Sequence, residues 1–375
     1  MEQSPDERIR ITYLLTLAEG EMPEARARAV ALEQTVELPD GCYPRRIEEQ
    51  VVGRLEALEQ RGPGRWQAIL SFAAALAGDG VPQLLNLVFG NVSFQRGVLV
   101  TGLELPSGVL RRFPGPRYGI AGIRAGCGGI RGRPLLCSAA KPQGLSPVEL
   151  AELCGALAKG GIDIVKDDHG VTDQAAAPFR ERVERCQGAV LEANAATGGS
   201  TLYFPHVTAP LGGLEERVTI ARAAGCRGVL ISPFLVGLDT IRWLAESTEL
   251  MVLVHPTFSG TLLRGDHGIA PAVLFGRLVR PLGADAVIYV SAGGRFPISE
   301  QDCEAINTSL REPLDHVRPA FPVAGGGVDV ERVPHWIDRY GVDTMFLVGS
   351  SLYAQADLET ASRRLVEAVR EHCDV

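Results

Sequence analysis

From residue 135 onward, short apolar runs alternate with longer segments of helical periodicity, and this alternation limits the possible folds more than any other feature. The runs are short, as strands buried on both faces are. They span residues 135–140, 162–165, 201–204, 228–231, 251–254, 286–290, 321–324 and 344–348. Helix-like segments follow at 147–159, 176–187, 214–224, 239–245, 271–282, 300–310, 330–340 and 354–371. Eight strand–helix pairs predict an α/β fold, a (β/α)8 TIM barrel.

The part of the chain before this repeat has a different character. A strand at 9–17, a helix at 22–33 and further mixed segments predict a smaller α+β domain. A stretch rich in Gly, Pro and Arg at 105–134 is typical of loops and of a domain boundary. We therefore expect domains at 1–125 and 126–375. A doubly wound sheet is the alternative to the barrel, but no G-x-G-x-x-G turn follows its first strand.

Bulk composition excludes several classes of partner. The net charge of −8 argues against nucleic acid and anionic membranes as partners. The 8 cysteines form no C-x-x-C pair, which favours reduced, mostly buried thiols in a cytoplasmic protein. The polar start of the chain is not typical of a signal peptide, and no apolar run approaches the ~20 residues of a membrane span.

Polar side chains follow several of the predicted strands at the point where each strand ends. In a barrel these ends share one rim, where the chemistry of such folds takes place. The cluster after the second strand is the densest, because a lysine, two aspartates and a histidine come within four residues. The candidate site residues at the strand ends are Lys141, Lys166, Asp168, His169, His206, His255 and Arg295.

Glycines follow the seventh and eighth strands. Gly325, Gly326 and Gly327 come after the seventh, and Gly349 and Ser350 come after the eighth. Backbone N–H groups in such loops can surround a phosphate, and many barrels hold phosphate there. Tight turns between strand and helix also require glycine, but both loops show the pattern. We therefore expect a phosphorylated small-molecule substrate.

These motifs together resemble the RuBisCO large-subunit superfamily over most of the chain. Residues 161–168 read G-I-D-I-V-K-D-D, similar to the family's G-x-D-F-x-K-x-D-E. The resemblance implies that Lys166 takes up CO2 as a carbamate and holds Mg²⁺ with Asp168, while His169 stands where the family has Glu. The segment K-P-Q at 141–143 resembles the family's K-P-K, whose first lysine contacts the substrate. The N-terminal domain is then ferredoxin-like.

The resemblance also implies an oligomer. Residues 90–92 read G-N-V, as in the family, whose Asn reaches into a neighbouring subunit's active site. We therefore expect a homodimer or an oligomer of dimers, in which Asn91, with Glu33 as a further candidate, completes the neighbour's site.

Departures from the family separate this chain from true carboxylases. The family's T-G-T-W is replaced by Q-T-V-E after Glu33, and its G-K-L-E-G loop by G-G-R-F-P at 293–297. The H-R-x-x-H after the fifth strand becomes H-P-T-F-S-G at 255–260. The chain is therefore similar to the RuBisCO-like proteins (type IV), which use the same enolisation for other chemistry than CO2 fixation.

The expected chemistry is enolisation of a phosphorylated ketose, assisted by Mg²⁺ or another divalent cation. Lys141, Lys166 and His255 are the expected catalytic groups, and Lys166, Asp168 and His169 the expected metal ligands. Without a carbamate, Lys166 is a candidate general base, with Lys141 as the alternative base or electrophile, and His169 as a proton shuttle instead of a ligand. Asn91, His206 and Arg295 are expected at the substrate, together with the two glycine loops.

Three functions follow from these residues. The first is an isomerase or tautomerase that moves a proton, for example on 5-methylthioribulose 1-phosphate. The second is a decarboxylase or C–C hydrolase of a phosphorylated 3-oxo sugar acid, of the 3-oxo-isoapionate 4-phosphate type, in which Arg295 first holds the departing carboxylate. The third is a non-catalytic sugar-phosphate sensor or scaffold, against which the retention of Lys141, Lys166 and Asp168 argues.

Overall fold

A computed structural model describes residues 7–375 of the chain. Two compact units emerge when residues are grouped by their contacts. The first contains Met1–Phe113 and Phe258–Pro281, and the second contains Pro114–Thr257 and Leu282–Val375. The chain thus leaves the second unit after Thr257 and returns to it at Leu282. The boundary expected between residues 125 and 126 stays a prediction.

The first unit is built on a sheet with the strand order β10-β4-β1-β3-β2, in which β1 to β4 are antiparallel. Alternate residues of β1 are buried, as a strand with one covered face requires. The order of helices and strands is that of a ferredoxin-like split βαβ unit, which confirms the α+β prediction. The main elements are β1 (Arg8–Thr16), α1 (Pro23–Glu33), α2 (Arg45–Gln50), β2 (Arg54–Gly62), β3 (Arg65–Ala73), α3 (Val81–Phe89), β4 (Val98–Glu104), α4 (Ser107–Leu110) and β10 (Gly268–Ile269).

Three short 3-10 helices, η1 (Ala74–Ala77), η2 (Asn91–Phe94) and η3 (Ser259–Thr261), also belong to the first unit. The expected helix at 271–282 is a π-helix, η4 (Val273–Val279), followed by the 3-10 turn η5 (Arg280–Leu282). Residues of η4 lie against β4. The periodicity therefore predicted a helix here correctly, but not its type.

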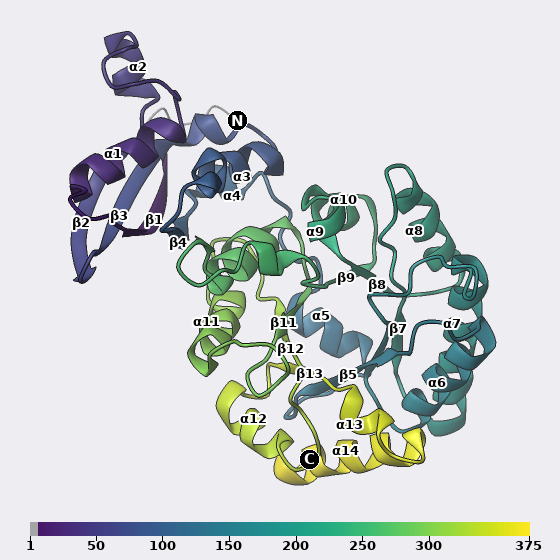
Figure 1. Ribbon diagram of the computed structural model, residues 1–375. Helices are drawn as coiled ribbons and strands as arrows, with labels where there is room; N and C mark the ends of the chain where they lie inside the picture. The colour runs from purple at the N-terminus through teal and green to yellow at the C-terminus, as the bar shows by residue number, and fades with distance from the viewer. Residues whose placement is uncertain (1–6) are drawn as a thin grey trace. The chain divides into compact units, whose positions relative to one another are not determined.

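The second unit is a barrel of eight parallel strands in the order β7-β6-β5-β13-β12-β11-β9-β8 (Figure 1). The ring closes between β7 and β8 through a parallel bridge from His206 to Leu230. The predicted (β/α)8 barrel is confirmed, with every strand within two residues of its expected position. The strands are β5 (Leu135–Ala140), β6 (Ile164–Asp167), β7 (Leu202–Phe204), β8 (Gly228–Ile231), β9 (Met251–Val254), β11 (Ala286–Val290), β12 (Phe321–Gly325) and β13 (Met345–Leu347).

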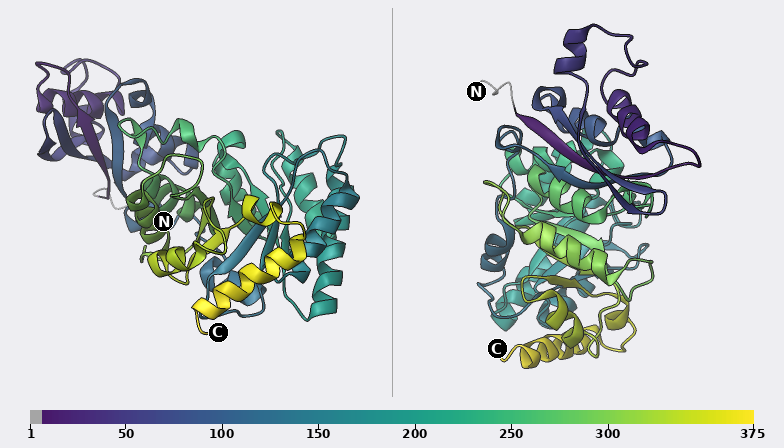
Figure 2. Two further views of the ribbon diagram at one scale, coloured as in Figure 1. Left: turned by 60° about the horizontal axis from the view of Figure 1, so that its bottom comes forward. Right: turned by 90° about the vertical axis from the view of Figure 1, so that its left-hand side faces the viewer.

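Helices surround these strands, and α14 packs beside α6 and α12 (Figures 1 and 2). Helix α6 begins with a capping box, in which Ser146 accepts from the Glu149 N–H and the Glu149 carboxylate accepts from the Ser146 N–H. The helices are α6 (Pro147–Lys159), α7 (Phe179–Thr197), α8 (Gly213–Ala223), α9 (Pro233–Val236), α10 (Asp239–Ser247), α11 (Glu300–Arg311), α12 (Val333–Tyr340), α13 (Ser350–Tyr353) and α14 (Leu358–His372).

Helix α5 (Gly119–Gly126) closes the N-terminal end of the barrel, in the stretch that its glycines predicted to be loop. Its Ile123 belongs to the apolar cluster that contains the first residues of β5, β7, β9 and β12. The Asp285 carboxylate, just before β11, accepts from the N–H groups of Tyr118 and Gly119 at the helix start. A Cβ on Gly126 would come within 2.8 Å of the Met251 side chain. This glycine therefore serves close packing and not a turn.

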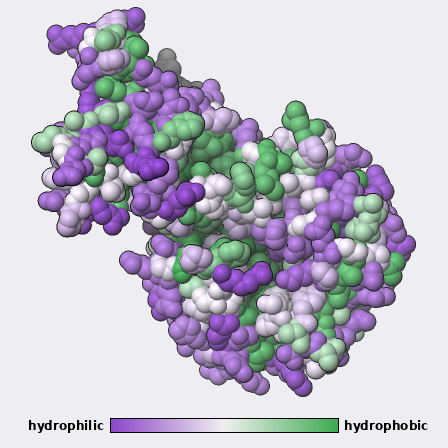
Figure 3. Space-filling view, viewed as in Figure 1, coloured by the Kyte–Doolittle hydropathy of each residue, from purple (hydrophilic) through white to green (hydrophobic). Residues whose placement is uncertain are grey.

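Hydrophilic residues predominate on the face seen in Figure 3, with hydrophobic residues between them. None of the helices among residues 7–375 is both long and apolar enough to span a membrane. All eight cysteines are free thiols, and six of them are buried, as expected.

His206, at the closure of the barrel, has no exposed surface. Its Nδ1–H donates to the Val171 carbonyl (3.2 Å), and its Nε2 accepts from the Ser232 hydroxyl (3.0 Å). Burial lowers the pKa of His206 from 6.5 to about 4. The unfolded chain therefore binds this proton at a higher pH than the folded chain does.

We predict that His206 makes the protein sensitive to acid. Its contribution to the free energy of unfolding is present above pH 6.5 and is lost as the pH falls towards 4. The loss amounts to about 3 kcal/mol, since one pKa unit corresponds to about 1.4 kcal/mol. Urea unfolding of the wild type and of His206→Gln between pH 7 and pH 4 measures this loss. The difference in free energy of unfolding between these two proteins should shrink on acidification. In the control His335→Gln, at an exposed histidine, the free energy of unfolding should change with pH as in the wild type. A difference that does not change with pH would contradict the prediction.

Candidate active site

The end of strand β6 sends successive side chains to opposite sides of the barrel wall. Ile164 belongs to the core inside the barrel, so Lys166, two residues later, faces the same interior. Asp167 faces the helices, where it accepts from Arg182 Nε (3.2 Å) and from the Tyr203 hydroxyl (2.6 Å). This alternation places the lysine in the barrel and its neighbouring carboxylate in the wall.

Lys166 is 1% exposed, and its Nζ donates to the backbone carbonyl of Asp167 at 3.1 Å. Burial lowers its pKa; the charges of Cys137, Asp168 and Asp167 act in the opposite direction. A larger fraction of this amine is therefore neutral than of an exposed lysine at the same pH. Only a neutral amine can take up CO2 or accept a proton.

The next two residues carry the other candidate metal ligands. Asp168 Oδ1 lies 3.6 Å from His169 Nδ1 and accepts the N–H of Gly170 at 3.0 Å. The ring of His169 stacks on that of His255, from the end of β9, with centroids 4.3 Å apart and planes 14° from parallel. Burial lowers the pKa of both imidazoles. The structure therefore brings His255 to the cluster that contains Lys166, Asp168 and His169.

These donors fit a divalent cation. The oxygen of Asp168 and the nitrogen of His169 are adjacent, and the lowered pKa of His169 favours the free base, whose lone pair a metal requires. Among residues 7–375, no three His, Cys, Asp or Glu side chains stand together as a metal site. A third protein ligand would therefore have to be of another kind, and a carbamate on Lys166 is an oxygen donor of the type that Mg²⁺ prefers.

Lys141, at the end of β5, points towards the loop that follows β13. Its Nζ lies 5.9 Å from the centre of the Tyr353 ring, whose hydroxyl donates to the Ala139 carbonyl at 2.8 Å. A Cβ on Gly349 would lie 2.7 Å from this Nζ. The absence of a side chain at Gly349 is therefore what lets the ammonium approach the predicted phosphate loop.

The loops after β11 and β12 touch through their backbones. A Cβ on Gly327 would lie 2.7 Å from the carbonyl carbon of Gly293. Gly326 and Gly327 both have positive φ, of 97° and 73°. The Trp336 indole N–H donates to the Gly327 carbonyl at 3.1 Å and ties the loop to α12. The glycines after β12 and β13 thus lie at the same end of the barrel as Lys141, Lys166 and His255.

Four of the predicted residues lie apart from this cluster or are already engaged. Both ring nitrogens of His206 are used within the barrel wall. Arg295 is exposed on its loop, and Ser350 is exposed at the start of α13. Asn91 belongs to the first unit, where its Nδ2–H donates to the Glu33 carboxylate at 3.1 Å. Contact of any of these four with a substrate stays a prediction.

Sequence reasoning missed two side chains that hold the site residues in place. Thr257 contacts His255, and Tyr353 lies beneath Lys141. Tyr353 left no signal in the sequence, because its role depends on where β13 lies beside β5. Thr257 left a weak signal, since it lies in the segment that departs from the family pattern.

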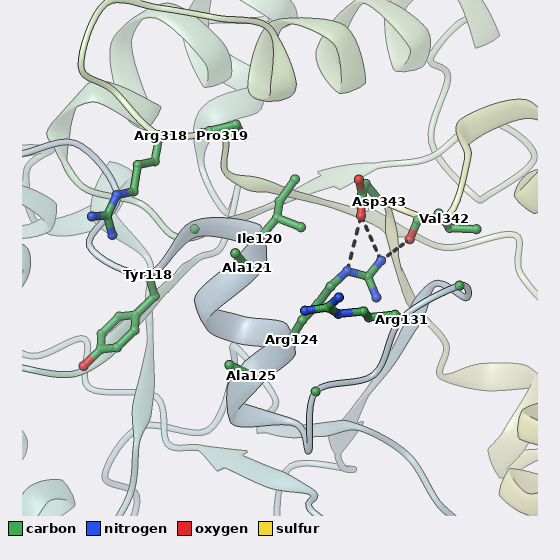
Figure 4. Close-up of a pocket in the computed structure, with 13 residues that line it drawn as sticks. Tyr118, Ile120, Ala121, Arg124, Ala125, Arg131, Arg318, Pro319, Val342 and Asp343 are labelled. Carbon is green, nitrogen blue, oxygen red and sulfur yellow. Dashed lines mark hydrogen bonds and ion pairs between the residues drawn. The ribbon is translucent and has the colours of Figure 1, made fainter.

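A cavity of about 670 Å³ lies beside α5 (Figure 4), at the N-terminal end of the barrel and away from this cluster. It is lined by α5 and the neighbouring loops. Arg124, on its wall, is paired with Asp343 at 2.9 Å. Size alone therefore does not locate the site.

Comparisons with known proteins agree with the geometry. Residues 123–372 match the family model described as the ribulose bisphosphate carboxylase large chain, catalytic domain. Ribulose bisphosphate carboxylase-like protein 1 of Rhodopseudomonas palustris is 40% identical over 369 residues, covering 98% of both chains. The 5-methylthioribulose-1-phosphate isomerase of Rhodospirillum rubrum is 38% identical, covering 94% of this chain and 93% of the relative.

Solved structures of Rubisco-like proteins are also similar to this chain. The crystal structure of a Rubisco-like protein from Rhodopseudomonas palustris superimposes with a TM-score of 0.88 at 38% identity, covering 97% of this chain and 98% of that one. The sequence resemblance, the barrel with its ferredoxin-like companion, and the lysine at the end of β6 all lead to one assignment. The chain belongs to the RuBisCO large-chain family and is one of its RuBisCO-like members.

Proposed function

We propose that this chain is a metal-dependent enolising enzyme that isomerises a phosphorylated ketose, and that it does not fix CO2. The substrate we favour is 5-methylthioribulose 1-phosphate, the compound after which the Rhodospirillum rubrum isomerase is named. Moving a proton between carbons next to a carbonyl requires a group that takes the proton, a positive partner for the oxygen, and a holder for the phosphate. The cluster at the barrel mouth offers all three.

The observation that carries this proposal is where the chain keeps its lysines. Of its 37 basic Lys and Arg residues, three are lysines: Lys141, Lys159 and Lys166. Two of these three stand in the cluster, one beside the glycine loop and one buried in the barrel. Arginine stays protonated in proteins, whereas a buried lysine can become neutral. At position 166 the chain thus has a lysine where a neutral amine has chemical use.

Each residue of the cluster then has a distinct task. Asp168, His169 and a carbamate on Lys166 would hold the divalent cation, which when bound supplies Lewis acidity for charge on the substrate oxygen. The ammonium of Lys141 lies where a phosphate bound by the Gly349 loop needs a positive charge. His255, stacked on His169, would face the substrate oxygens.

The other two functions have less support. Decarboxylation of a 3-oxo sugar acid needs a cation that holds the departing carboxylate, and Arg295, the candidate, lies exposed on its loop. A non-catalytic sensor of sugar phosphates would have no use for a buried lysine of lowered pKa.

We also propose a homodimer or an oligomer of dimers, located in the cytoplasm. The Asn91–Glu33 hydrogen bond keeps the amide of Asn91 on an exposed surface of the first unit. There it is available to complete the site of a neighbouring subunit. The free thiols suit a reducing compartment.

Loss of Lys166 should abolish enolisation. In Lys166→Ala, metal-dependent exchange of the carbon-bound substrate hydrogen in D2O should fall by about 100- to 10,000-fold, because the variant lacks the carbamate that would hold the cation and, without a carbamate, the candidate base. Proton NMR of 5-methylthioribulose 1-phosphate with Mg²⁺ and bicarbonate measures this exchange. Exposed Lys159→Ala is the matched control and should exchange at the wild-type rate. Unchanged exchange in Lys166→Ala would refute the enolisation proposal.

The small number of lysines makes the state of Lys166 directly observable. Protein labelled with 13C at the lysine ε-carbon should give three signals, assigned with Lys141→Ala and Lys166→Ala. The Lys166 signal should titrate below 10.5, the ordinary lysine value, because burial favours the neutral amine. Addition of 13C-bicarbonate and Mg²⁺ should shift this signal and leave that of Lys159 unchanged. A Lys166 that titrates at or above 10.5 and does not respond to bicarbonate is incompatible with a carbamate.

A methyl group at Gly349 should disturb phosphate binding through Lys141. The added Cβ would displace the Nζ that lies 2.7 Å from its position. Gly349→Ala should raise KM for the phosphorylated substrate about 10-fold, equivalent to roughly 1.4 kcal/mol. Gly188→Ala, which meets open space on α7, is the control. An unchanged KM would remove Lys141 and this loop from the phosphate site.

A further inference from the structure

Thr257 lies two residues after His255, where the chain leaves β9, and contacts the histidine twice. Its backbone N–H donates to Nδ1 of His255 at 3.1 Å. Its hydroxyl oxygen lies 2.6 Å from the same nitrogen. An amide N–H can only donate, so Nδ1 must be the acceptor in both bonds. A neutral imidazole whose Nδ1 accepts carries its hydrogen on Nε2.

We propose that Thr257 is a positioning residue that fixes His255 in the Nε2–H tautomer and holds the plane of its ring. Stacking against His169 restrains the face of the ring, and Thr257 restrains its edge. The nitrogen remote from Thr257 is then a permanent donor when the ring is neutral. Thr257 contacts no reacting atom and acts only through His255.

This tautomer defines what His255 does, given the proposed function on which this step rests. A neutral imidazole with Nε2–H donates a hydrogen bond to the substrate oxygen on which negative charge develops during enolisation. The opposite tautomer would present a lone pair to that oxygen and repel it. Thr257 therefore makes His255 an electrophilic partner of the substrate and leaves removal of the carbon-bound proton to another group.

The buried His206 provides a built-in reference. His206 donates from Nδ1 to the carbonyl of Val171, which can only accept, so its hydrogen lies on Nδ1. Its Nε2 accepts from the Ser232 hydroxyl. The two histidines in one barrel should thus show opposite tautomers in a single sample.

The tautomers can be measured by 15N NMR of the full chain labelled at its seven histidines. At pH 8, long-range proton–nitrogen spectra of the wild type, assigned with His255→Gln and His206→Gln, should show Nε2–H for His255 and Nδ1–H for His206. This measurement needs neither substrate nor metal. Nδ1–H for His255 in the wild type overturns the proposal by itself.

Thr257→Val and Thr257→Ser then separate the hydroxyl from the shape of the side chain. In Thr257→Val only the backbone N–H still donates to Nδ1, so a minor Nδ1–H population of His255 should appear. The ring is then less firmly held, and kcat for the ketose phosphate should fall about 10- to 100-fold, as for other residues that orient a functional histidine. KM should change less than about twofold, because the ground-state contacts remain. Thr257→Ser should restore both the tautomer and kcat.

A Thr257→Val variant in which His255 keeps the wild-type tautomer and kcat is unchanged also overturns the proposal. If Thr257→Val fails to fold, Thr257→Ser provides the test. A Thr257→Ser variant that loses kcat while His255 keeps the wild-type tautomer overturns the proposal. If the wild type shows the expected tautomers but turns over no phosphorylated ketose, the proposed function fails and the assignment of Thr257 stands.

Discussion

The buried ion pair between Arg182 and Asp167 holds the part of the barrel on which the site depends. Both side chains are at most 1% exposed. The Asp167 carboxylate also accepts from the Tyr203 hydroxyl and from the backbone N–H of His206. One carboxylate thus joins α7, the end of β6 and two positions on or beside β7. A buried pair of this kind contributes little net stability relative to apolar packing, but breaking one partner is costly. Its consequence here is geometric, because with Asp167 fixed in the wall Lys166 must point inward.

The strands of the barrel were predictable because their physics is local. A strand buried on both faces must be a short apolar run, so β5, β8, β9 and β11 have the expected bounds. Helix α5 was not predictable in the same way. Its glycines indicated loop residues, whereas Gly122 and Gly126 are required by close contacts with Tyr118 and Met251. Contacts between segments far apart in the chain leave no local pattern.

The residues of the candidate site also differ in whether a local sequence pattern or a contact between distant segments brings them together. Lys166, Asp168 and His169 are neighbours in the chain, so their proximity followed from the motif. The stacking of His169 on His255 and the approach of Lys141 to Gly349 depend on how strands far apart in sequence meet, which one sequence does not contain. His206 shows the converse. Its two ring nitrogens contact Val171 and Ser232, which follow the neighbouring strands β6 and β8, and its position at a strand end gave no sign of these bonds.

The histidine at position 169 changes the electrostatics of the site relative to the glutamate of the family pattern. Two imidazoles stacked at 4.3 Å cannot both carry a proton without strong repulsion, and Lys166 lowers the pKa of each ring further. At least one ring is therefore neutral. A neutral His169 offers a lone pair to a cation, and a neutral His255 offers a hydrogen-bond donor to an oxygen. In the proposed carbamate Lys166 would lose the positive charge that lowers the pKa of both rings, and a bound cation would then be the positive charge beside them.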